Sequence, residues 1–513
     1  MSDWYGGGAA TPRGRITAYN SANGSDLWSA SGTGFGDTLG KSLAPAGDLN
    51  GDGVPDLFAG APMHECDCPF NGKVIAYSGS SGAVIFTATG TNALGWSVAN
   101  LGDVNLDGID DCAAGAPTSY FYDITHGDVF LLSGIGGAHL LSVPGVANGS
   151  FLGASVAGVG DMNLDGVPDL AIGSPGTIIQ FYGSFGGFLF PPTGAGSVRI
   201  VSGAGGGALA AWSGAAEGDA FGFALASAGD SNGDGVPDVL IGAPGADAPG
   251  IQSGRASVYS GATGAQILSV AGQSAGELLG AALADLGDID VDGARDLAVG
   301  APFATSGGFA AAGSARVFVH PNTFLLGSID GPQSGLSFGA ALAAGDVNGD
   351  GVSELLVGGS AGPGAPGATL ASLVPFGLKL YGRSSPGCDG PHRLMGSGVP
   401  FIGSATFEIR TDRAPASSLG IVVLTDRLLA SGADPFGVGL NLYIDFAASN
   451  TLVLLDHPAD AAGIGHTPLP IPPMPTLAGQ RFTGQSIFAW GAPCTPAPLG
   501  LSASNALVLL IQP

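Results

Sequence analysis

The sequence predicts an all-β protein, with a β-propeller over residues 1–377 and an antiparallel β-sandwich over residues 378–513. Three observations lead to this prediction. An acidic nine-residue pattern recurs six times at a nearly constant spacing. Short apolar runs bounded by Gly, Pro and Asn surround each copy, and no long run has the 3.6-residue period of a helix. After the last copy, a different series of alternating strand-like runs fills the rest of the chain.

The acidic pattern is the clearest feature of the chain. Successive copies begin 55, 58, 69, 58 and 58 residues apart, and a period of this length is typical of a repeat architecture. The six copies are Asp48–Asp56, Asp103–Asp111, Asp161–Asp169, Asp230–Asp238, Asp288–Asp296 and Asp346–Glu354.

Each repeat has the same internal order. A Phe-Gly or Leu-Gly turn is followed by a short Ala/Val/Leu run, the acidic loop, an apolar run ending near Gly-Ala-Pro, and a strand such as GKVIAYSG from Gly72 or GRASVYSG from Gly254. The runs are four to seven residues long. Four short strands per repeat predict the blades of a propeller.

The acidic loops predict metal ligands. Side chains at positions 1, 3, 5 and 9, with the backbone carbonyl at position 7, surround one ion with oxygen, and Gly at position 6 permits the sharp bend. Calcium accepts an irregular cage of oxygens, whereas magnesium requires stricter octahedral geometry and zinc prefers nitrogen or sulfur. We therefore expect up to six Ca²⁺ ions. The predicted ligands are Asp48, Asn50, Asp52, Val54, Asp56, Asp103, Asn105, Asp107, Ile109, Asp111, Asp161, Asn163, Asp165, Val167, Asp169, Asp230, Asn232, Asp234, Val236, Asp238, Asp288, Asp290, Asp292, Ala294, Asp296, Asp346, Asn348, Asp350, Val352 and Glu354.

The loops have two other interpretations. An EF-hand needs helices on both sides and an acid at position 12, but the residues there are Ala59, Ala114, Ile172, Ile241, Val299 and Val357. An Asx-rich turn without metal is the simpler alternative. It is disfavoured because packing three carboxylates together without a cation is costly.

Three loops depart from the common pattern. The second loop adds Asp110, and we expect it to bind in the same way. The fifth has Asp290 in place of Asn and Arg295 at position 8, and the sixth ends in Glu354, whose longer side chain would shift the ion. The metal-free alternative is stronger for these last two loops.

The charge balance limits the partners. With 41 acidic and 15 basic residues the formal charge is −26, which disfavours nucleic acid binding. The six loops hold 20 of the 41 acidic residues, and six Ca²⁺ ions at two charges each would bring the formal charge to −14. No run of eighteen apolar residues occurs, so we expect no membrane span.

The paired Phe-Gly and Gly-Ala-Pro signatures around D-x-N-x-D-G-x-x-D resemble the FG-GAP repeats of the integrin alpha-subunit propeller and its bacterial relatives. The resemblance covers residues 1 to about 377. It implies calcium ligation through position 9, partner contacts on the face opposite the metal loops, and seven blades. Residues 1–33 would form the incomplete first blade, completed by a strand near Leu373 to Leu380. A six-bladed ring closed by the N-terminal strands is the alternative.

The expected calcium affinity indicates where the protein acts. Solvent-facing calcium modules bind at roughly 0.1–1 mM, so cytosolic calcium would leave these loops empty. We therefore expect a secreted, periplasmic or cell-surface protein. The N-terminus has neither a basic nor an apolar leader region, so an export signal is expected upstream of Met1 or already removed.

Residues 378–513 contain alternating runs such as TFEIRT, IVVLTDRLL and TLVLLDH, which predict the sandwich. Their opening, KLYGRSSPGCDG, and their close, LSASNALVLLIQ, resemble a C-terminal domain of secreted bacterial propeller proteins. Cys388 and Cys494 lie near the two ends of this segment and would form either a disulfide or two buried thiols.

No catalytic constellation is evident. Two G-x-S-x-G matches, Gly272–Gly276 and Gly335–Gly339, lie before blade turns rather than at a strand-to-helix elbow. His64, Cys66 and Cys68 form a weak candidate for a soft-metal site, with a Cys66–Cys68 bridge or free thiols as the alternative. Cys112 is expected to be a small core residue. Aromatic residues beside the Phe-Gly turns, namely Phe35, Phe221 and Phe338, are expected to pack within blades.

These observations favour a non-enzymatic, extracytoplasmic calcium-binding propeller that presents a rigid surface for adhesion or protein recognition, with calcium in a structural role. The expected partner is a protein or a surface glycan. A secreted polysaccharide-active hydrolase or lyase on the same scaffold is one alternative. Carbohydrate binding by the C-terminal domain, through Trp490 and Tyr443, is another.

Overall fold

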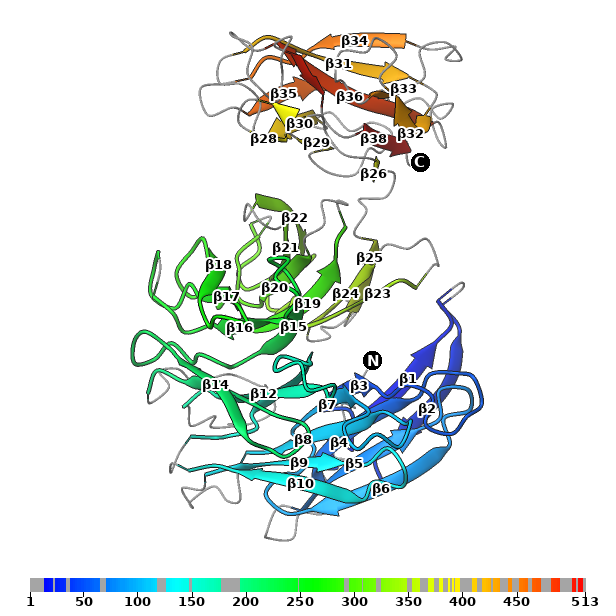
Figure 1. Ribbon diagram of the computed structural model, residues 1–513, viewed down its shortest axis with the longest axis vertical. Coiled ribbons are helices and arrows are strands. Elements are labelled where there is room, and N and C mark those ends of the chain that lie inside the picture. Colours follow the sequence, from blue (N-terminus) through cyan, green and yellow to red (C-terminus); the bar gives the residue numbers. More distant parts are fainter. Residues whose placement is uncertain are drawn as a thin grey trace. The chain divides into compact units, whose positions relative to one another are not determined.

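A computed structural model describes the chain over a series of segments. They are residues 13–21, 24–33, 37–64, 71–117, 126–146, 150–176, 194–247, 249–289, 295–306, 308–319, 324–347, 353–359, 368–372, 378–381, 386–387, 390–391, 393–396, 408–412, 418–425, 428–433, 442–444, 452–459, 464–471, 481–489, 501–503 and 506–510. Within these segments every element is a β-strand (Figure 1). The predicted all-β class is therefore confirmed.

Seven antiparallel sheets follow one another in the N-terminal part of the described chain. The first has two strands, β1 (Arg15–Tyr19) and β2 (Asp26–Ser31), and the last has three, β23 (Ala341–Gly345), β24 (Glu354–Gly358) and β25 (Ala368–Ser372). The five sheets between them have four strands each: β3–β6 (Ser42–Pro45, Leu57–His64, Asn71–Tyr77, Val84–Gly90), β7–β10 (Ser97–Gly102, Asp111–Ala116, Asp128–Leu132, His139–Pro144), β11–β14 (Ser155–Gly160, Asp169–Ser174, Ser197–Val201, Ala208–Ser213), β15–β18 (Leu225–Gly229, Asp238–Ala243, Arg255–Tyr259, Gln266–Ala271) and β19–β22 (Ala282–Gly287, Asp296–Ala301, Ser314–Val319, Phe324–Asp330).

The order within each four-stranded sheet is the chain order, so each sheet is a simple meander. This is the blade that the repeat predicts. The first strands of neighbouring sheets, β3, β7, β11 and β15, contact one another in succession (Figure 1). The loops that follow these first strands therefore lie at the same end of successive sheets.

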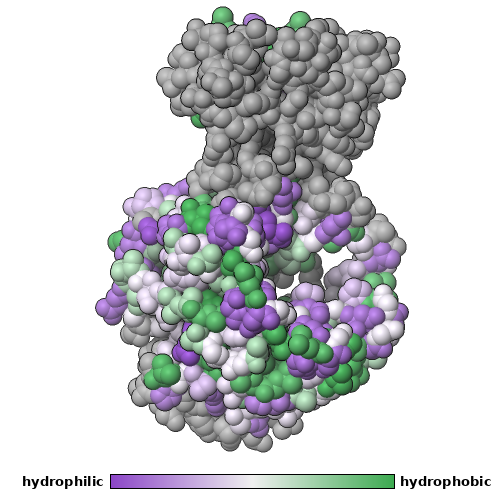
Figure 2. Space-filling model, viewed as in Figure 1, coloured by the Kyte–Doolittle hydropathy of each residue, from purple (hydrophilic) through white to green (hydrophobic). Residues whose placement is uncertain are grey.

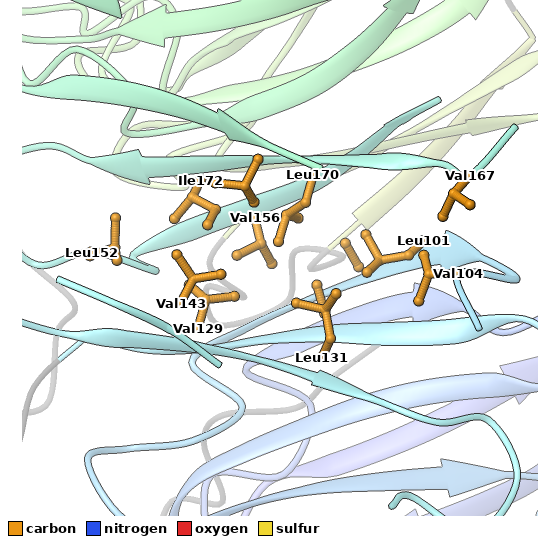
Figure 3. Packing of buried hydrophobic residues seen from close by; sticks show 13 residues of the cluster. Leu101, Val104, Val129, Leu131, Val143, Leu152, Val156, Val167, Leu170 and Ile172 are labelled. Carbon is orange, nitrogen blue, oxygen red and sulfur yellow. The ribbon is translucent and has the colours of Figure 1, made fainter. Parts of the chain in front are cut away.

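Hydrophobic side chains fill the space between neighbouring sheets. One cluster joins Val129, Leu131 and Val143 of the β7–β10 sheet to Leu170 and Ile172 of the next sheet (Figure 3). In the described residues, similar clusters lie between the other successive sheets from β1–β2 to β19–β22. Because Val129, Leu131 and Ile172 have 0% exposure, burial between blades holds the repeat array together.

The FG-GAP pattern has a direct structural cause. The amide of Gly40, in the Leu-Gly turn, donates to the carbonyl of Gly60, in the Gly-Ala-Pro run of the same sheet, at 3.0 Å. Gly60 also lies against the next sheet, because a Cβ on it would be 1.9 Å from the carbonyl oxygen of Gly95. A side chain is thus excluded at Gly60, and Gly40 has a left-handed backbone (φ 85°) that favours glycine. The same amide-to-carbonyl bond joins Gly95 to Gly115, Gly153 to Gly173, Gly222 to Gly242, Gly280 to Gly300 and Gly339 to Gly358.

The aromatic residues of these turns pack inside the blades, as predicted. Phe221 is 5% exposed and Phe338 is 2% exposed. The ring of Phe221 contacts that of Tyr259 edge-on, with centroids 5.8 Å apart. Phe35 lies outside the described residues.

The number of blades stays a prediction, but the strand expected to complete the first blade needs correction. Of the closing strand expected near Leu373 to Leu380, residues 373–377 lie outside the described chain, and Leu378–Tyr381 (β26) pairs with β38 (Ala506–Leu510) instead. The six-bladed alternative closes the ring with the N-terminal strands. In the described residues β25 pairs with β24 and β1 pairs with β2, so the seven-bladed and the six-bladed rings both stay predictions.

The C-terminal part contains the remaining strands. They are β26, β27 (Pro386–Gly387), β28 (Gly390–Pro391), β29 (Arg393–Gly396), β30 (Glu408–Asp412), β31 (Gly420–Thr425), β32 (Leu428–Ala433), β33 (Leu442–Ile444), β34 (Leu452–Asp456), β35 (Gly465–Pro468), β36 (Arg481–Ala489), β37 (Leu501–Ala503) and β38. The largest sheet has the order β26-β38-β36-β31-β34, with β37 also paired to β36, and a second sheet has the order β29-β30-β35. The sandwich arrangement stays a prediction.

By contacts, the chain divides into two compact units. The first consists of Met1–Leu286, Arg295–Asp350 and Leu355–Leu370, and the second of Gly287–Ala294, Gly351–Glu354 and Ala371–Pro513. The predicted boundary after residue 377 falls beside residues that are not described, and it stays a prediction. In the described segments, no helix is long and apolar enough to span a membrane.

Candidate metal centre

Four of the six acidic loops are described completely. Loop 1 (Asp48–Asp56), loop 2 (Asp103–Asp111), loop 3 (Asp161–Asp169) and loop 4 (Asp230–Asp238) each join the first strand of a four-stranded sheet to the second. Of loop 5 (Asp288–Asp296) and loop 6 (Asp346–Glu354), residues 290–294 and 348–352 lie outside the described chain. The predicted ligands Asp290, Asp292, Ala294, Asn348, Asp350 and Val352 are among these residues.

In loop 1, the side chains at positions 1, 3 and 5 turn inward onto the backbone of the loop. Asp48 accepts hydrogen bonds from the amides of Gly51 (2.8 Å), Asp52 (3.0 Å) and Gly53 (2.8 Å). Asn50 Oδ1 accepts from the amide of Asp52 at 2.9 Å, and Asp52 Oδ1 accepts from that of Val54 at 2.9 Å. Because Asp48 Oδ1 and Asn50 Oδ1 approach the same nitrogen, the side chains at positions 1 and 3 converge.

Loops 2, 3 and 4 repeat this pattern. In each, the amide at position 5 donates to the side chains at positions 1 and 3, the amide at position 6 donates to position 1, and the amide at position 7 donates to position 5. The position 1, 3 and 5 residues are Asp103, Asn105 and Asp107, then Asp161, Asn163 and Asp165, then Asp230, Asn232 and Asp234. Four independent copies with one geometry indicate that the sequence pattern itself fixes the loop.

Glycine is required where the loop bends. At position 6, Gly53, Gly108, Gly166 and Gly235 have φ between 82° and 90°, which confirms the predicted sharp bend. Position 4 is also left-handed, with Gly51 and Gly233 in loops 1 and 4 but Leu106 (φ 62°) and Leu164 (φ 59°) in loops 2 and 3. The two leucines are 70% and 67% exposed, so the bulky side chain at this strained position points into solvent.

Position 9 has a different environment from positions 1 to 5. Asp56, Asp111, Asp169 and Asp238 are 0–4% exposed. In loop 1, Asp56 accepts from the amide of Leu49 at 2.8 Å and from that of Gly79, in the turn after the third strand, at 2.9 Å. The corresponding glycines in loops 2, 3 and 4 are Gly134, Gly203 and Gly261. The position 9 carboxylate therefore fastens the loop to a neighbouring turn of its own sheet.

Burial and hydrogen bonding change the acidity of the loop carboxyls in opposite directions. Burial raises the pKa of Asp111 and of Asp169, and the backbone amides that they accept offset part of this rise. The hydroxyl of Ser80 donates to Asp52 Oδ2 at 2.7 Å, and this bond is the main cause that lowers the pKa of Asp52. Asp52 is thus held ionised at the surface, whereas Asp111 and Asp169 are costly to ionise without a compensating positive charge.

The donor set suits a hard cation. Each complete loop offers three carboxylates and one amide oxygen, with no nitrogen or sulfur ligand. A carboxylate oxygen has more than one lone pair, so accepting a backbone amide leaves capacity for an ion. However, across the described segments no three His, Cys, Asp or Glu side chains are arranged to hold an ion. The structure brings positions 1, 3 and 5 together, and it directs position 9 to the amide of position 2. The carbonyls of Val54, Ile109, Val167 and Val236 stay predicted ligands.

The residue at position 8 contacts the first strand of its own sheet. In loop 2, Asp110 Oδ2 accepts a hydrogen bond from Asn100 Nδ2, on β7, at 2.8 Å. Arg295, the corresponding residue of loop 5, forms an ion pair with Asp285 on β19, with Nε 2.9 Å from Oδ2. In both pairs the partner precedes position 8 by ten residues. This fixed spacing is the only signal in the sequence that points to the pairing.

The other candidates from the sequence are resolved in part. Cys112 is a free thiol with 0% exposure, and burial raises its pKa, so the prediction of a core residue is confirmed. In the described chain no helix follows Gly272–Gly276 or Gly335–Gly339, as a nucleophile elbow would require. Cys66, Cys68, Cys388, Cys494 and Trp490, as well as the side chains of His64 and Tyr443, lie outside the described residues.

Comparison with known proteins finds sequence similarity to the FG-GAP repeat and to integrin alpha chains. The profile of the FG-GAP repeat matches residues 39–84, 221–262 and 338–372. Integrin alpha-5 of Xenopus laevis is 32% identical over 247 residues, which cover 44% of this chain and 22% of that protein. Integrin alpha pat-2 of Caenorhabditis elegans is 31% identical over 236 residues, covering 40% and 18%. Human integrin alpha-6 is 33% identical over 152 residues, covering 28% and 13%.

The chain thus spans about a fifth or less of the length of these integrin relatives. Among solved structures, the Dos1 propeller aligns with a TM-score of 0.41 and 10% identity, over 70% of this chain and 73% of that one.

Proposed function

From the premise that this chain is an FG-GAP repeat protein with an integrin-alpha-like β-propeller, we propose that it binds calcium through its acidic loops and acts outside the cytoplasm as a rigid recognition or adhesion module. The observation that carries the proposal is the shared geometry of loops 1 to 4. Each places oxygens of positions 1, 3 and 5 around one short stretch of backbone and a buried carboxylate at position 9 behind it.

Calcium has a structural role in this proposal. The position 9 carboxylate is buried, and an ionised carboxylate in a buried site needs a compensating charge. A divalent ion supplies that charge and replaces the repulsion among three acids by attraction. The loops join the first two strands of each sheet, so an ion there stabilises the blade itself.

The proposed location follows from affinity. A solvent-facing loop of this type binds calcium at roughly 0.1–1 mM, a concentration found outside cells rather than in the cytosol. The integrin alpha relatives are the basis for proposing a protein or surface glycan as partner. Figure 2 shows hydrophobic residues beside hydrophilic ones on the face in view, so that face offers both kinds of contact. No particular contact residue is assigned.

The test measures metal content and stability on the full chain. Equilibrium dialysis followed by elemental analysis is expected to find at least four Ca²⁺ ions per chain, and Mg²⁺ at equal concentration should not displace them. At 5 mM Ca²⁺, saturation of four such sites should raise the melting temperature by roughly 5–10 °C over the protein in excess EGTA. The variant Asp48→Asn/Asp52→Asn should lose one ion. A melting temperature that is the same in calcium and in EGTA would refute the structural role.

Recognition is tested separately. Immobilised full-length protein, with and without calcium, is screened against extracellular-matrix proteins and a glycan array. We expect calcium-dependent capture of a protein or glycan ligand, with no turnover of it. Release of shortened glycan would instead support the polysaccharide-active alternative.

A further inference from the structure

The residue at position 8 of one acidic loop lies against the loop of the preceding blade. The position 8 residues of loops 3 and 4 are prolines. Pro168 Cγ is 3.3 Å from where a Cβ on Gly102 would lie, and Pro237 Cγ is 3.0 Å from where a Cβ on Gly160 would lie. These glycines directly precede position 1 of loops 2 and 3. They have φ of 73° and 77°, which favours glycine and leaves the space that the neighbouring residue occupies.

In two blades the same place holds a charge instead of proline. Asp110 Oδ2 lies 2.7 Å from the place of a Cβ on Gly47, which precedes Asp48 of loop 1. Arg295 Nε lies 2.7 Å from the place of a Cβ on Gly229, which precedes Asp230 of loop 4. The two loops thus have the same internal geometry but neighbouring charges of opposite sign.

The two charges are not equally compensated. Asp110 accepts a hydrogen bond from the neutral amide of Asn100, which does not offset its negative charge beside loop 1. Arg295 is paired with Asp285, with 2.5 Å between Nη2 and Oδ2, so its positive charge acts on loop 4 in part. Because an exposed charge is screened over about 10 Å at 0.1 M salt, each acts chiefly on the loop against which it lies.

We propose that the position 8 residue of the following blade sets the calcium affinity of each loop, so that Asp110 strengthens loop 1 and Arg295 weakens loop 4. This inference rests on the proposed calcium binding. Loops 2 and 3, which have proline neighbours, lie between the two extremes. The loops then fill in a fixed order as calcium rises, with loop 1 before loop 4.

Two tryptophans make loops 1 and 4 separately measurable. Trp28 Nε1 donates to the carbonyl of Gly79 at 2.7 Å, and Gly79 holds the position 9 carboxylate of loop 1. Trp212 Nε1 donates to the carbonyl of Gly264 at 2.9 Å, in the turn where Gly261 holds the position 9 carboxylate of loop 4. Terbium bound in either loop is therefore expected to be excited through its own tryptophan.

The experiment titrates Ca²⁺ against Tb³⁺ in the full chain and follows tryptophan-sensitised terbium emission. In the Trp212→Phe variant, Trp28 remains and its sensitised emission reports loop 1. In the Trp28→Phe variant, Trp212 remains and reports loop 4. The double variant measures the terbium emission excited by the other tryptophans, which is subtracted from both. Asp110→Asn is expected to lower the calcium affinity of loop 1 on the order of three- to tenfold. Arg295→Met is expected to raise the calcium affinity of loop 4 by a smaller factor. Each variant should leave the other loop unchanged.

Net charge is controlled with Asp247→Asn, an exposed acid beyond the end of β16 opposite to loop 4, which should alter neither loop. The effect of Asp110→Asn should also shrink in 0.5 M KCl because the interaction is electrostatic. If terbium and calcium bind but both variants leave both affinities unchanged, the tuning by position 8 is wrong and calcium binding stands. If no metal binds either loop, the proposed function fails and this inference fails with it.

Discussion

At the residue scale, His457 shows how the second unit manages a buried polar side chain. The ring has 0% exposure and packs on Phe488, with centroids 5.5 Å apart. Thr467 Oγ1 donates to the carbonyl of Asp456 at 2.7 Å, so it accepts from His457 Nδ1–H, which is 2.6 Å away. Nε2 is then the unprotonated nitrogen, and it lies 2.6 Å from Thr411 Oγ1. Each nitrogen of the neutral ring therefore has a polar partner.

Protonating this ring would bury a charge, and stability should depend on pH accordingly. Burial, assisted by the charge of His466, lowers the pKa of His457 from 6.5 to about 4. Between these values the unfolded chain binds the proton and the folded chain does not. The neutral His457 ring therefore makes its full contribution to the free energy of unfolding above pH 6.5. This contribution is lost as the pH falls to 4, which lowers the free energy of unfolding by about 3 kcal/mol.

The measurement is urea unfolding of the full chain at pH 7, 5.5 and 4, with tryptophan emission and circular dichroism compared. The variant His457→Gln is the control, because it lacks the titrating group. Its free energy of unfolding should fall less over this interval than that of the wild type. Equal losses in the two proteins would show that other groups cause the acid sensitivity.

Sequence reasoning reached the loops but not the contacts of His457 or of position 8. Every predicted ligand of loop 1 lies within nine consecutive residues, so local geometry alone brings Asp48, Asn50 and Asp52 together. His457, in contrast, meets Thr411 from 46 residues earlier in the chain. Pairings over such distances depend on how the sheets are assembled, and the local sequence patterns around each residue do not show that assembly.

At the scale of the element, a serine hydroxyl links successive blades. Ser42, at the start of β3, donates to the carbonyl of Gly95 in the next blade at 2.9 Å. Ser97 and Ser155 repeat the contact with Gly153 (2.9 Å) and Gly222 (2.7 Å). In the β15–β18 and β19–β22 sheets the equivalent residues are Ala224 and Ala282. The contact is thus used between some blades and omitted between others.

We expect Ser155→Ala to lower the free energy of unfolding by about 1 kcal/mol, because it removes one hydrogen bond from a carbonyl next to the FG-GAP contact. Calorimetry at pH 7.5 in 1 mM CaCl₂ measures the change. Ser29→Ala is the matched control, since Ser29 lies on β2 and accepts only an exposed hydrogen bond from Arg15. A larger loss in the control than in Ser155→Ala would show that the hydroxyl does not link the blades.

The blade was predictable as an element because its pattern is local and repeated. A four-stranded unit follows from the runs between each Phe-Gly turn and the next, and five described sheets have this form. The closing strand was not predictable in the same way. Leu378–Tyr381 alternates apolar and polar residues and fits any sheet edge. Its partner, Ala506–Leu510, lies near the other end of the same C-terminal segment, and only long-range pairing decides between the possible edges.

At the scale of the whole molecule, charge is unevenly distributed between interior and surface. Of the 15 basic residues, Lys73 and Arg316 are used in buried ion pairs, with Asp37 at 2.9 Å and Glu277 at 2.7 Å. In each pair the positive and negative charges cancel. The acids of the loops, at positions 1 and 5, lie near the surface instead, so repulsion among them opposes folding whenever metal is absent.

Salt should therefore stabilise the metal-free protein more than the calcium-bound protein. Screening lengthens from about 8 Å at 0.15 M to 30 Å at 0.01 M, so repulsion within and between neighbouring loops is strongest at low salt. In EGTA, raising KCl from 20 to 300 mM should increase the melting temperature by roughly 3–6 °C. In 5 mM Ca²⁺ the increase should be less than half as large, because the bound ions neutralise the same carboxylates. Differential scanning calorimetry at the four conditions measures both values, and an equal response to salt with and without calcium would show that the loop acids are not the source of the repulsion.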